Sequence, residues 1–259
     1  MTKFQSPAHV DTAMEGVRTG VELINSAFGY ARDLVTPDPE VWRAPVMVIP
    51  GFMAHDMTTY ALRSALRPEG YHAYDSNTGF NLGVVNDIAQ RQQDQLDRIF
   101  EEHDGQKVGL IGHSLGGIQV MHLAYNNPDK VSSVTTLGSP FGGAMDKSGV
   151  NRMVEWVFVL LNSHDREIQD SLRDRLNEGP PDMPVMSIYS PHDGVVSADS
   201  AQNPWADDYA DIQNVEIAES SKQSHLGMVC SVDVLNAVKD HLNQHSDVVT
   251  SAEHALVPA

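Results

Sequence analysis

The sequence of 259 residues contains a single cysteine, Cys230. One cysteine cannot form a disulfide within the chain, and it cannot supply the cysteine cluster of a structural zinc site. Lys and Arg together number 17 against 35 Asp and Glu, which gives a formal net charge of −18. A nucleic-acid-binding protein needs a basic surface, so this charge excludes that class, and it also disfavours an anionic membrane surface as a partner.

Long apolar runs and nucleotide-binding loops are also missing. No stretch approaches the roughly 20 apolar residues that span a bilayer, so we expect no integral membrane segment. The first residues have no apolar run of the signal-peptide type. We expect a cytoplasmic protein if Met1 is the native start, and a secreted one if a signal peptide has been removed. Neither Gly-x-Gly-x-x-Gly nor a P-loop occurs, so no nucleotide or other cofactor is expected.

Short apolar runs alternate with helical patterns along most of the chain. Expected strands lie at 46–49, 71–74, 108–111, 131–137, 184–189 and 215–218, and expected helices at 57–67, 84–102, 115–126 and 228–243. Continuous apolar strands are typical of a parallel sheet that is buried on both faces. The alternation therefore predicts an α/β fold, with a mainly parallel sheet of about six strands and helices on both faces.

Two regions fall outside this alternation. Residues 1–40 contain an amphipathic pattern over 11–35, which predicts an N-terminal helical extension packed on the core. Residues 141–183 separate two strands by about forty positions, whereas a crossover needs only a dozen or so. We expect this insertion to form either a helical cap over the sheet edge or a long packed crossover helix.

Gly112-His113-Ser114-Leu115-Gly116 fits the Gly-x-Ser-x-Gly nucleophile elbow, in which a serine lies on a sharp turn between a strand and a helix. The apolar run 108–111 precedes the motif and the apolar helical pattern 118–124 follows it. Side chains at the flanking glycine positions would collide across so sharp a turn. The setting predicts that Ser114 is a nucleophile, and the alternative is a glycine-rich turn with an idle serine.

On this motif, residues 46–244 resemble the α/β-hydrolase superfamily, and Gly-His-Ser-Leu-Gly-Gly resembles bacterial lipases and carboxylesterases in particular. The resemblance implies the α/β-hydrolase fold over residues 41–259, with a small cap or lid at 141–183. It also implies a catalytic triad in the chain order serine, acid, histidine.

That order indicates Asp193 and His225 as the other two members of the triad. Asp193 follows the strand 184–189 in a loop that resembles the family's Asp-Gly-x-Val, and His225 stands between the last strand and the final helix. His113 flanks the nucleophile and is expected to point elsewhere. The rival carboxylates of the next loop are expected to be solvated surface charges; they are Asp199, Asp207, Asp208 and Asp211.

The resemblance further implies two backbone N–H donors for the oxyanion of an acyl-transfer reaction. One donor belongs to Leu115, directly after the nucleophile. The other belongs to Phe52, in the loop after the strand 46–49. Lipases there commonly show His-Gly followed by an apolar residue, whereas this chain has Pro50-Gly51-Phe52, so the side chain that often braces this loop is absent.

The acyl pocket is predicted from apolar side chains near these residues. Met53, like Met57, offers adaptable apolar surface, with plain core packing as the alternative. Trp156 and Phe158 belong to an apolar block of the insertion and are expected to overhang Ser114.

Together these residues predict a serine carboxylic-ester hydrolase, of lipase or esterase type, that forms an acyl-enzyme on small-molecule or lipid esters with medium or long acyl chains. Two alternatives remain open: an acyltransferase that uses the same triad, and a non-catalytic binding protein on this fold. The aspartates after the acid loop have no recognised calcium spacing, so no metal is expected.

Overall fold

The computed structural model describes residues 41–83, 86–140, 174–175, 178–245 and 248–250. The predicted N-terminal extension over 1–40 and most of the predicted insertion over 141–183 lie outside these residues. Among the helices that are described, none is long and apolar enough to cross a bilayer.

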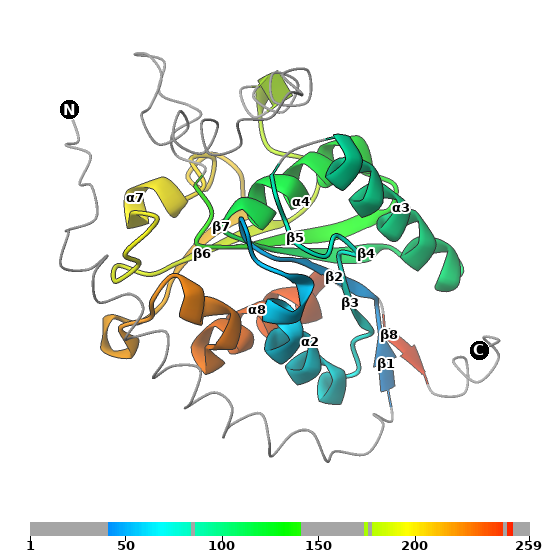
Figure 1. The fold of residues 1–259 in the computed structure, drawn as a ribbon, viewed down its shortest axis with the longest axis horizontal. Helices are drawn as coiled ribbons and strands as arrows, with labels where there is room; N and C mark the ends of the chain where they lie inside the picture. The colour runs from blue at the N-terminus through cyan, green and yellow to red at the C-terminus, as the bar shows by residue number, and fades with distance from the viewer. Residues whose placement is uncertain (1–40, 84–85, 141–173, 176–177, 246–247, 251–259) are drawn as a thin grey trace.

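A six-stranded sheet forms the centre of the molecule, in the order β3-β2-β4-β5-β6-β7 (Figure 1). The strands are β2 (Val46–Ile49), β3 (Ala73–Asp75), β4 (Val108–His113), β5 (Val131–Leu137), β6 (Val185–Tyr189) and β7 (Ile212–Glu216). Every neighbouring pair is parallel. The predicted α/β class and the mainly parallel sheet of about six strands are therefore confirmed.

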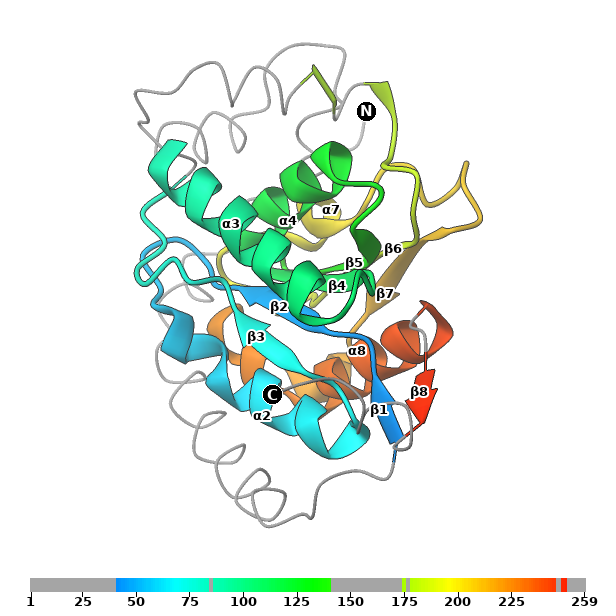
Figure 2. The same ribbon diagram turned by 90° about the vertical axis from the view of Figure 1, so that its right-hand side faces the viewer.

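Helices cover both faces of this sheet, as Figure 2 shows. One face carries α3 (Asn86–Glu102), α4 (Leu115–Asn126) and the short α7 (Ala198–Ala201), and the other carries α2 (Tyr60–Leu66) and α8 (Val232–His245). Short 3-10 turns lie at Asp56–Thr59, Arg67–Glu69, Glu219–Ser221 and Leu226–Cys230. Covering both faces keeps the parallel strands away from water.

Successive side chains of β2 enter two separate cores. Met47 and Ile49 pack with residues of α3 and α4, whereas Val46 and Val48 pack with residues of α2 and α8. All four side chains are fully buried. Each contributes about 1.5–3 kcal/mol by leaving water, and this explains why the strand is a continuous apolar run rather than an alternating one.

Three boundaries differ from the sequence-based expectations. β7 begins at Ile212 rather than at Val215, because this edge strand carries polar side chains that hide its start. The strand expected at 71–74 lies at Ala73–Asp75. The helix expected over 228–243 is divided into a 3-10 turn and α8, with the Ser231 hydroxyl accepting a hydrogen bond from the Val234 N–H at the start of α8.

A second, two-stranded sheet was not predicted from the sequence. β1 (Val41–Arg43) pairs antiparallel with β8 (Val248–Thr250), with Val41 opposite Thr250. The pairing brings the first and last described segments of the chain side by side (Figure 1).

The turn between β4 and α4 is packed against the end of β2. A Cβ atom on Gly112 would collide with the backbone of Gly116, and a Cβ on Gly116 would collide with the carbonyl oxygens of Ile49 and Pro50. Because all of these neighbours are backbone atoms, they cannot rotate away as a flexible side chain would. The two glycines of the motif are therefore required by close packing.

Gly116→Ala should lower the free energy of unfolding by about 3 kcal/mol or more, which is the upper range of single-residue overpacking. A glycine-to-alanine change inside a helix ordinarily stabilises by about 1 kcal/mol, so the expected sign is reversed. Urea unfolding followed by circular dichroism measures the change. A variant as stable as the wild type would contradict the close packing.

Candidate active site

Ser114 lies between β4 and α4 in a backbone conformation that L-residues rarely adopt, with φ 53° and ψ −119°. Its N–H donates to the carbonyl oxygen of Leu137, at the end of β5, over 2.8 Å. The side chain is partly exposed at the carboxyl edge of the sheet. A serine held in a strained turn at this edge, directly before the N-terminus of a helix, matches the predicted nucleophile elbow.

Asp193 and His225 form a buried hydrogen-bonded pair. The His225 Nδ1 lies 2.7 Å from Asp193 Oδ2, and the residues are only 3% and 6% exposed, respectively. The other carboxylate oxygen of Asp193 accepts hydrogen bonds from the N–H groups of Val195 and Val196, at 2.8 and 2.7 Å. Since an ionised carboxylate only accepts hydrogen bonds, this geometry puts the imidazole proton on Nδ1 and the lone pair on Nε2.

The loops that carry this pair are tied together. The Ser190 hydroxyl, directly after β6, donates to the carbonyl oxygen of Gln223 over 2.7 Å and accepts from the His192 N–H over 3.1 Å. The acid loop and the histidine loop are therefore held in register. The predicted residues Asp193 and His225 are brought together by contacts that the sequence does not reveal.

Gly138, directly after β5, was missed by the sequence analysis. A Cβ atom at this position would lie 2.9 Å from Asp193 Oδ2 and 3.3 Å from His225 Nδ1, and the backbone has φ 55°. The Gly138 N–H donates to the carbonyl oxygen of Ile188 in β6 over 2.9 Å. A glycine here leaves room for the acid–imidazole pair between β5 and β6, and Gly-Ser-Pro after a strand was the signal available for it.

His113 points toward the histidine loop, so the expectation that it points elsewhere is wrong. Its Nε2 lies 2.9 Å from the carbonyl oxygen of His225, and the two rings are 4.8 Å apart between centroids. Burial, together with the smaller effect of the neighbouring His225, lowers the pKa of His113 to about 3. His113 is therefore a neutral imidazole whose Nε2–H donates to the backbone of His225.

The loop after β2 carries the second predicted oxyanion donor. Phe52 is half-buried and packs against the core beneath α4. No described residue accepts a hydrogen bond from its N–H. Leu115 is the first residue of α4, where N–H groups have no partner within the helix. Because Gly116 touches the carbonyls of Ile49 and Pro50, the start of α4 lies directly against this loop.

Met53 and Met57 are exposed, by 66% and 62%, so packing in the core, the alternative for both residues, is wrong. Met53 also has a positive φ of 56°. Trp156 and Phe158, the other predicted pocket residues, lie outside the described part of the chain.

The rival aspartates of the following region are all exposed; they are Asp199, Asp207, Asp208 and Asp211. Among the described residues, no cluster of three or more His, Cys, Asp or Glu side chains is arranged to hold a metal ion.

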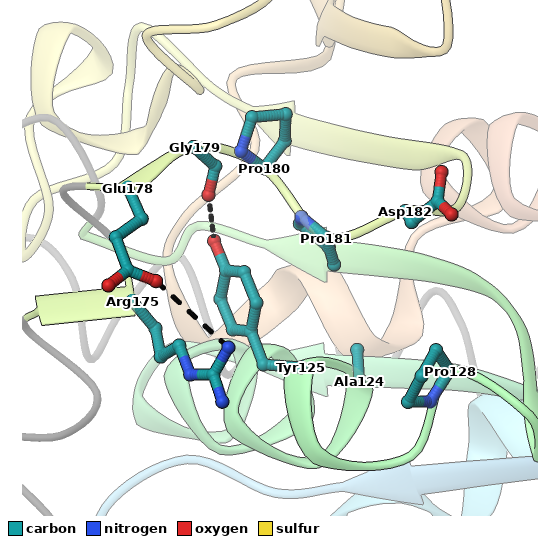
Figure 3. Close-up of a pocket in the computed structure, with 9 residues that line it drawn as sticks. All are labelled: Ala124, Tyr125, Pro128, Arg175, Glu178, Gly179, Pro180, Pro181 and Asp182. Carbon is teal, nitrogen blue, oxygen red and sulfur yellow. Dashed lines mark hydrogen bonds and ion pairs between the residues drawn. The ribbon is translucent and has the colours of Figure 1, made fainter.

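A separate pocket lies at the other end of α4 (Figure 3). Tyr125 stands at its centre, and its hydroxyl donates to the carbonyl oxygen of Gly179 over 2.6 Å. Arg175 and Glu178 face each other at its rim. Since Tyr125 is eleven positions after Ser114 along a helix with a rise of 1.5 Å per residue, the pocket is about 16 Å from the elbow. It does not belong to the candidate active site.

Comparison with known proteins places these features in a family. Residues 67–226 match the family model described as the alpha/beta hydrolase fold. The chain is 29% identical over 154 residues to a triacylglycerol lipase of Pseudarthrobacter phenanthrenivorans, a match that covers 50% of this chain and 48% of the relative. A triacylglycerol lipase of Burkholderia plantarii is also 29% identical over 154 residues, covering 50% of this chain and 43% of that protein. The chain thus matches somewhat less than half the length of these relatives.

Solved structures agree on the fold. The monoacylglycerol lipase of Paleococcus ferrophilus superposes with a TM-score of 0.54 at 17% sequence identity, covering 80% of this chain and 99% of that one. Est1E from Butyrivibrio proteoclasticus gives a TM-score of 0.53 at 14% identity, covering 78% and 86% of the two chains. At these identities the likeness concerns the arrangement of strands and helices.

The buried His113 predicts a pH dependence of stability. In the unfolded chain its pKa returns to about 6.5, so between pH 6.5 and about 3 the unfolded state binds one more proton at this residue. Above this window, the titration of His113 does not change the free energy of unfolding. As the pH falls through the window, the free energy of unfolding decreases progressively, by up to about 1.4 kcal/mol per pH unit. His113→Gln keeps a donor for the His225 carbonyl but cannot titrate. In urea titrations between about pH 7 and 4.5, the free energy of unfolding should fall less steeply for this variant, and equal slopes would refute the assignment.

Proposed function

Since this chain belongs to the α/β-hydrolase family, we propose that it is a serine carboxylic-ester hydrolase of lipase or esterase type, with Ser114, His225 and Asp193 as its catalytic triad. The observation that carries the proposal is the buried 2.7 Å hydrogen bond between His225 Nδ1 and Asp193 Oδ2, at the same sheet edge as a serine in a strained elbow. The triacylglycerol lipases among its relatives support an ester substrate.

The first half of the reaction acylates the serine. Ser114 Oγ attacks the ester carbonyl carbon while its proton passes to His225 Nε2, and the carbonyl oxygen becomes an oxyanion. The tetrahedral intermediate then collapses. The bond to the alcohol oxygen breaks, and the alcohol leaves with the proton that His225 carried.

The second half returns the enzyme to its starting state. Water attacks the acyl-serine ester, giving its proton to His225, and the carboxylic acid is released as Ser114 regains its proton. Throughout, Asp193 holds the Nδ1–H of His225 and stabilises the imidazolium that forms twice per cycle. The two N–H groups of Val195 and Val196 hold the Asp193 side chain in its orientation toward His225.

Two backbone donors stabilise the oxyanion. The N–H of Leu115 points out of the first turn of α4, where the helix dipole also favours negative charge. The N–H of Phe52 comes from the loop that α4 touches through Gly116. Donors fixed before the reaction need no reorganisation as charge develops, and this makes them effective.

The acyl chain of the substrate lies against apolar surface beside the oxyanion donors. Met53 is exposed next to Phe52, and a flexible thioether side chain adapts to acyl chains of different shape. An exposed apolar side chain in the loop that approaches Ser114 at Gly51 supports medium or long acyl esters as substrates. Trp156 and Phe158 remain predicted members of this pocket.

Ser114→Ala should lower kcat for p-nitrophenyl esters by at least about a thousandfold, because loss of the nucleophile removes the acyl-enzyme route. An organophosphonate should label the wild type at one site and leave the variant unlabelled, as intact mass spectrometry would show. Thermal unfolding serves as the folding control. Ester hydrolysis that survives in a folded variant, or labelling at another residue, would remove Ser114 from the nucleophile role.

Asp193→Asn should lower kcat by roughly 10⁴, because an amide at this position favours the wrong tautomer of His225. Asp207→Asn and Asp208→Asn are matched controls, since both carboxylates are exposed and follow the same strand. Each control should stay within about twofold of the wild-type rate. If a control proved the sensitive variant in initial-rate measurements, the acid would have to be reassigned.

A further inference from the structure

Asn81 and Gln119 form a buried amide pair beneath the loop of the proposed oxyanion hole. Asn81 Nδ2 donates to Gln119 Oε1 over 2.7 Å, and Gln119 Nε2 donates back to Asn81 Oδ1 over 3.0 Å. The residues are 0% and 4% exposed. Asn81 follows β3, whereas Gln119 lies one helical turn after Leu115 in α4, so the pair joins two elements that the chain does not connect directly.

All four amide hydrogens of the pair are used. Asn81 Nδ2 also donates to the carbonyl oxygen of Pro50 over 2.7 Å, and Gln119 Nε2 also donates to that of Gly83 over 3.0 Å. Backbone carbonyls can only accept, so each side-chain amide has one possible orientation. A saturated pair of this kind, away from water, is held more rigidly than a pair at the surface.

Asn81 is hydrogen-bonded to the loop after β2 on both sides of the peptide that carries the Phe52 N–H. Its side chain holds the Pro50 carbonyl, which belongs to the peptide before Gly51–Phe52. Its own carbonyl accepts from the Met53 N–H over 2.7 Å, and that N–H belongs to the peptide after Gly51–Phe52. The peptide that carries the Phe52 N–H therefore stands between two hydrogen bonds to one residue. The same peptide is also held directly, because its Gly51 carbonyl oxygen accepts from the Ala54 N–H over 3.1 Å, and the three hydrogen bonds together restrict its rotation.

We propose that Asn81 and Gln119 are positioning residues that aim the Phe52 N–H at the oxyanion and hold it in register with the Leu115 N–H. The inference rests on the proposed ester hydrolase function and adds to it the device that replaces a bracing side chain in the loop Pro50-Gly51-Phe52. Gln119 belongs to α4, the helix that carries the Leu115 N–H. Through its hydrogen bond with Asn81, it fixes the loop that carries the Phe52 N–H. Donor direction, rather than substrate affinity, is what the pair controls.

The chain contains a matched control for this proposal. Gln93 and Asn127 form a second reciprocal amide pair, with Gln93 Nε2 to Asn127 Oδ1 at 2.9 Å and Asn127 Nδ2 to Gln93 Oε1 at 2.8 Å. That pair joins α3 to the C-terminal end of α4, at the end of the helix away from Ser114. Its loss should weaken packing on α4 without reaching the oxyanion loop.

The experiment compares Gln119→Met with Gln93→Met, since Met keeps the volume of Gln and removes its hydrogen bonds. Each variant is assayed with a p-nitrophenyl ester and with the corresponding thionoester, whose sulfur accepts N–H hydrogen bonds weakly. Gln119→Met should lower kcat for the ester by at least about tenfold with KM within about twofold, because removal of a whole donor costs 10²–10³. The preference for the ester over the thionoester should fall by a similar factor.

Gln93→Met should keep the wild-type kcat and the wild-type preference, even if its thermal midpoint falls as far as that of Gln119→Met. Asn81→Ala should reproduce the loss of kcat. In the Asn81→Ala background, Gln119→Met should cost less than about a further twofold, because Gln119 acts through the Asn81 amide. Gln119→Leu, which removes the acceptor for Asn81 as well as both donors, is the substitute if the Met variant does not fold, and the same loss of kcat is expected for it.

The outcomes separate this inference from the function on which it rests. If the wild type hydrolyses neither ester, the proposed function itself fails. If the wild type is active and Gln119→Met matches Gln93→Met in kcat and in thionoester preference, the pair is structural and only this inference is overturned. Multiplying losses in the double variant would overturn it as well, since the two residues would then act independently.

Discussion

The close approach of the first turn of α4 to the end of β2 is the constraint on which the rest of the site depends. Gly116 lies against the carbonyls of Ile49 and Pro50, and this contact permits no Cβ atom. The contact fixes the position of Ser114 relative to the sheet, and it places the N-terminus of α4 beside the loop after β2. The strained backbone of Ser114 persists because buried strands on one side and a buried helix on the other leave it no alternative.

Much of the fold was predictable because its strands are buried on both faces. The run 46–49 shows its role directly, since each of its side chains enters one of two cores. β7 was misplaced for the opposite reason: as an edge strand it needs few apolar residues, and Gln213 and Asn214 conceal its true start. β1 and β8 were missed because three residues carry too little periodicity to indicate a strand.

The candidate site was predictable where chain order and a local motif coincide, as at Ser114, Asp193 and His225. Residues that act through long-range contacts gave no such signal. Asn81 and Gln119 are separated by 38 positions, and His113 meets the His225 carbonyl across 112. In the sequence, polar side chains of this kind cannot be distinguished from ordinary surface residues, because only the folded structure buries them. The missing bracing residue at Pro50 was visible in the sequence, but its replacement by Asn81 was visible only in three dimensions.

The β1–β8 ribbon joins the first and last described segments of the chain, and its stability depends on the rest of the domain. A ribbon of three residue pairs is too small to persist alone in water. Here the folded sheet keeps both ends near each other, so the two segments meet at an effective concentration set by the domain rather than by diffusion of a long free chain. The ribbon therefore exists only as long as the domain does, and it is the part expected to open first by local fraying, well before the parallel sheet loosens.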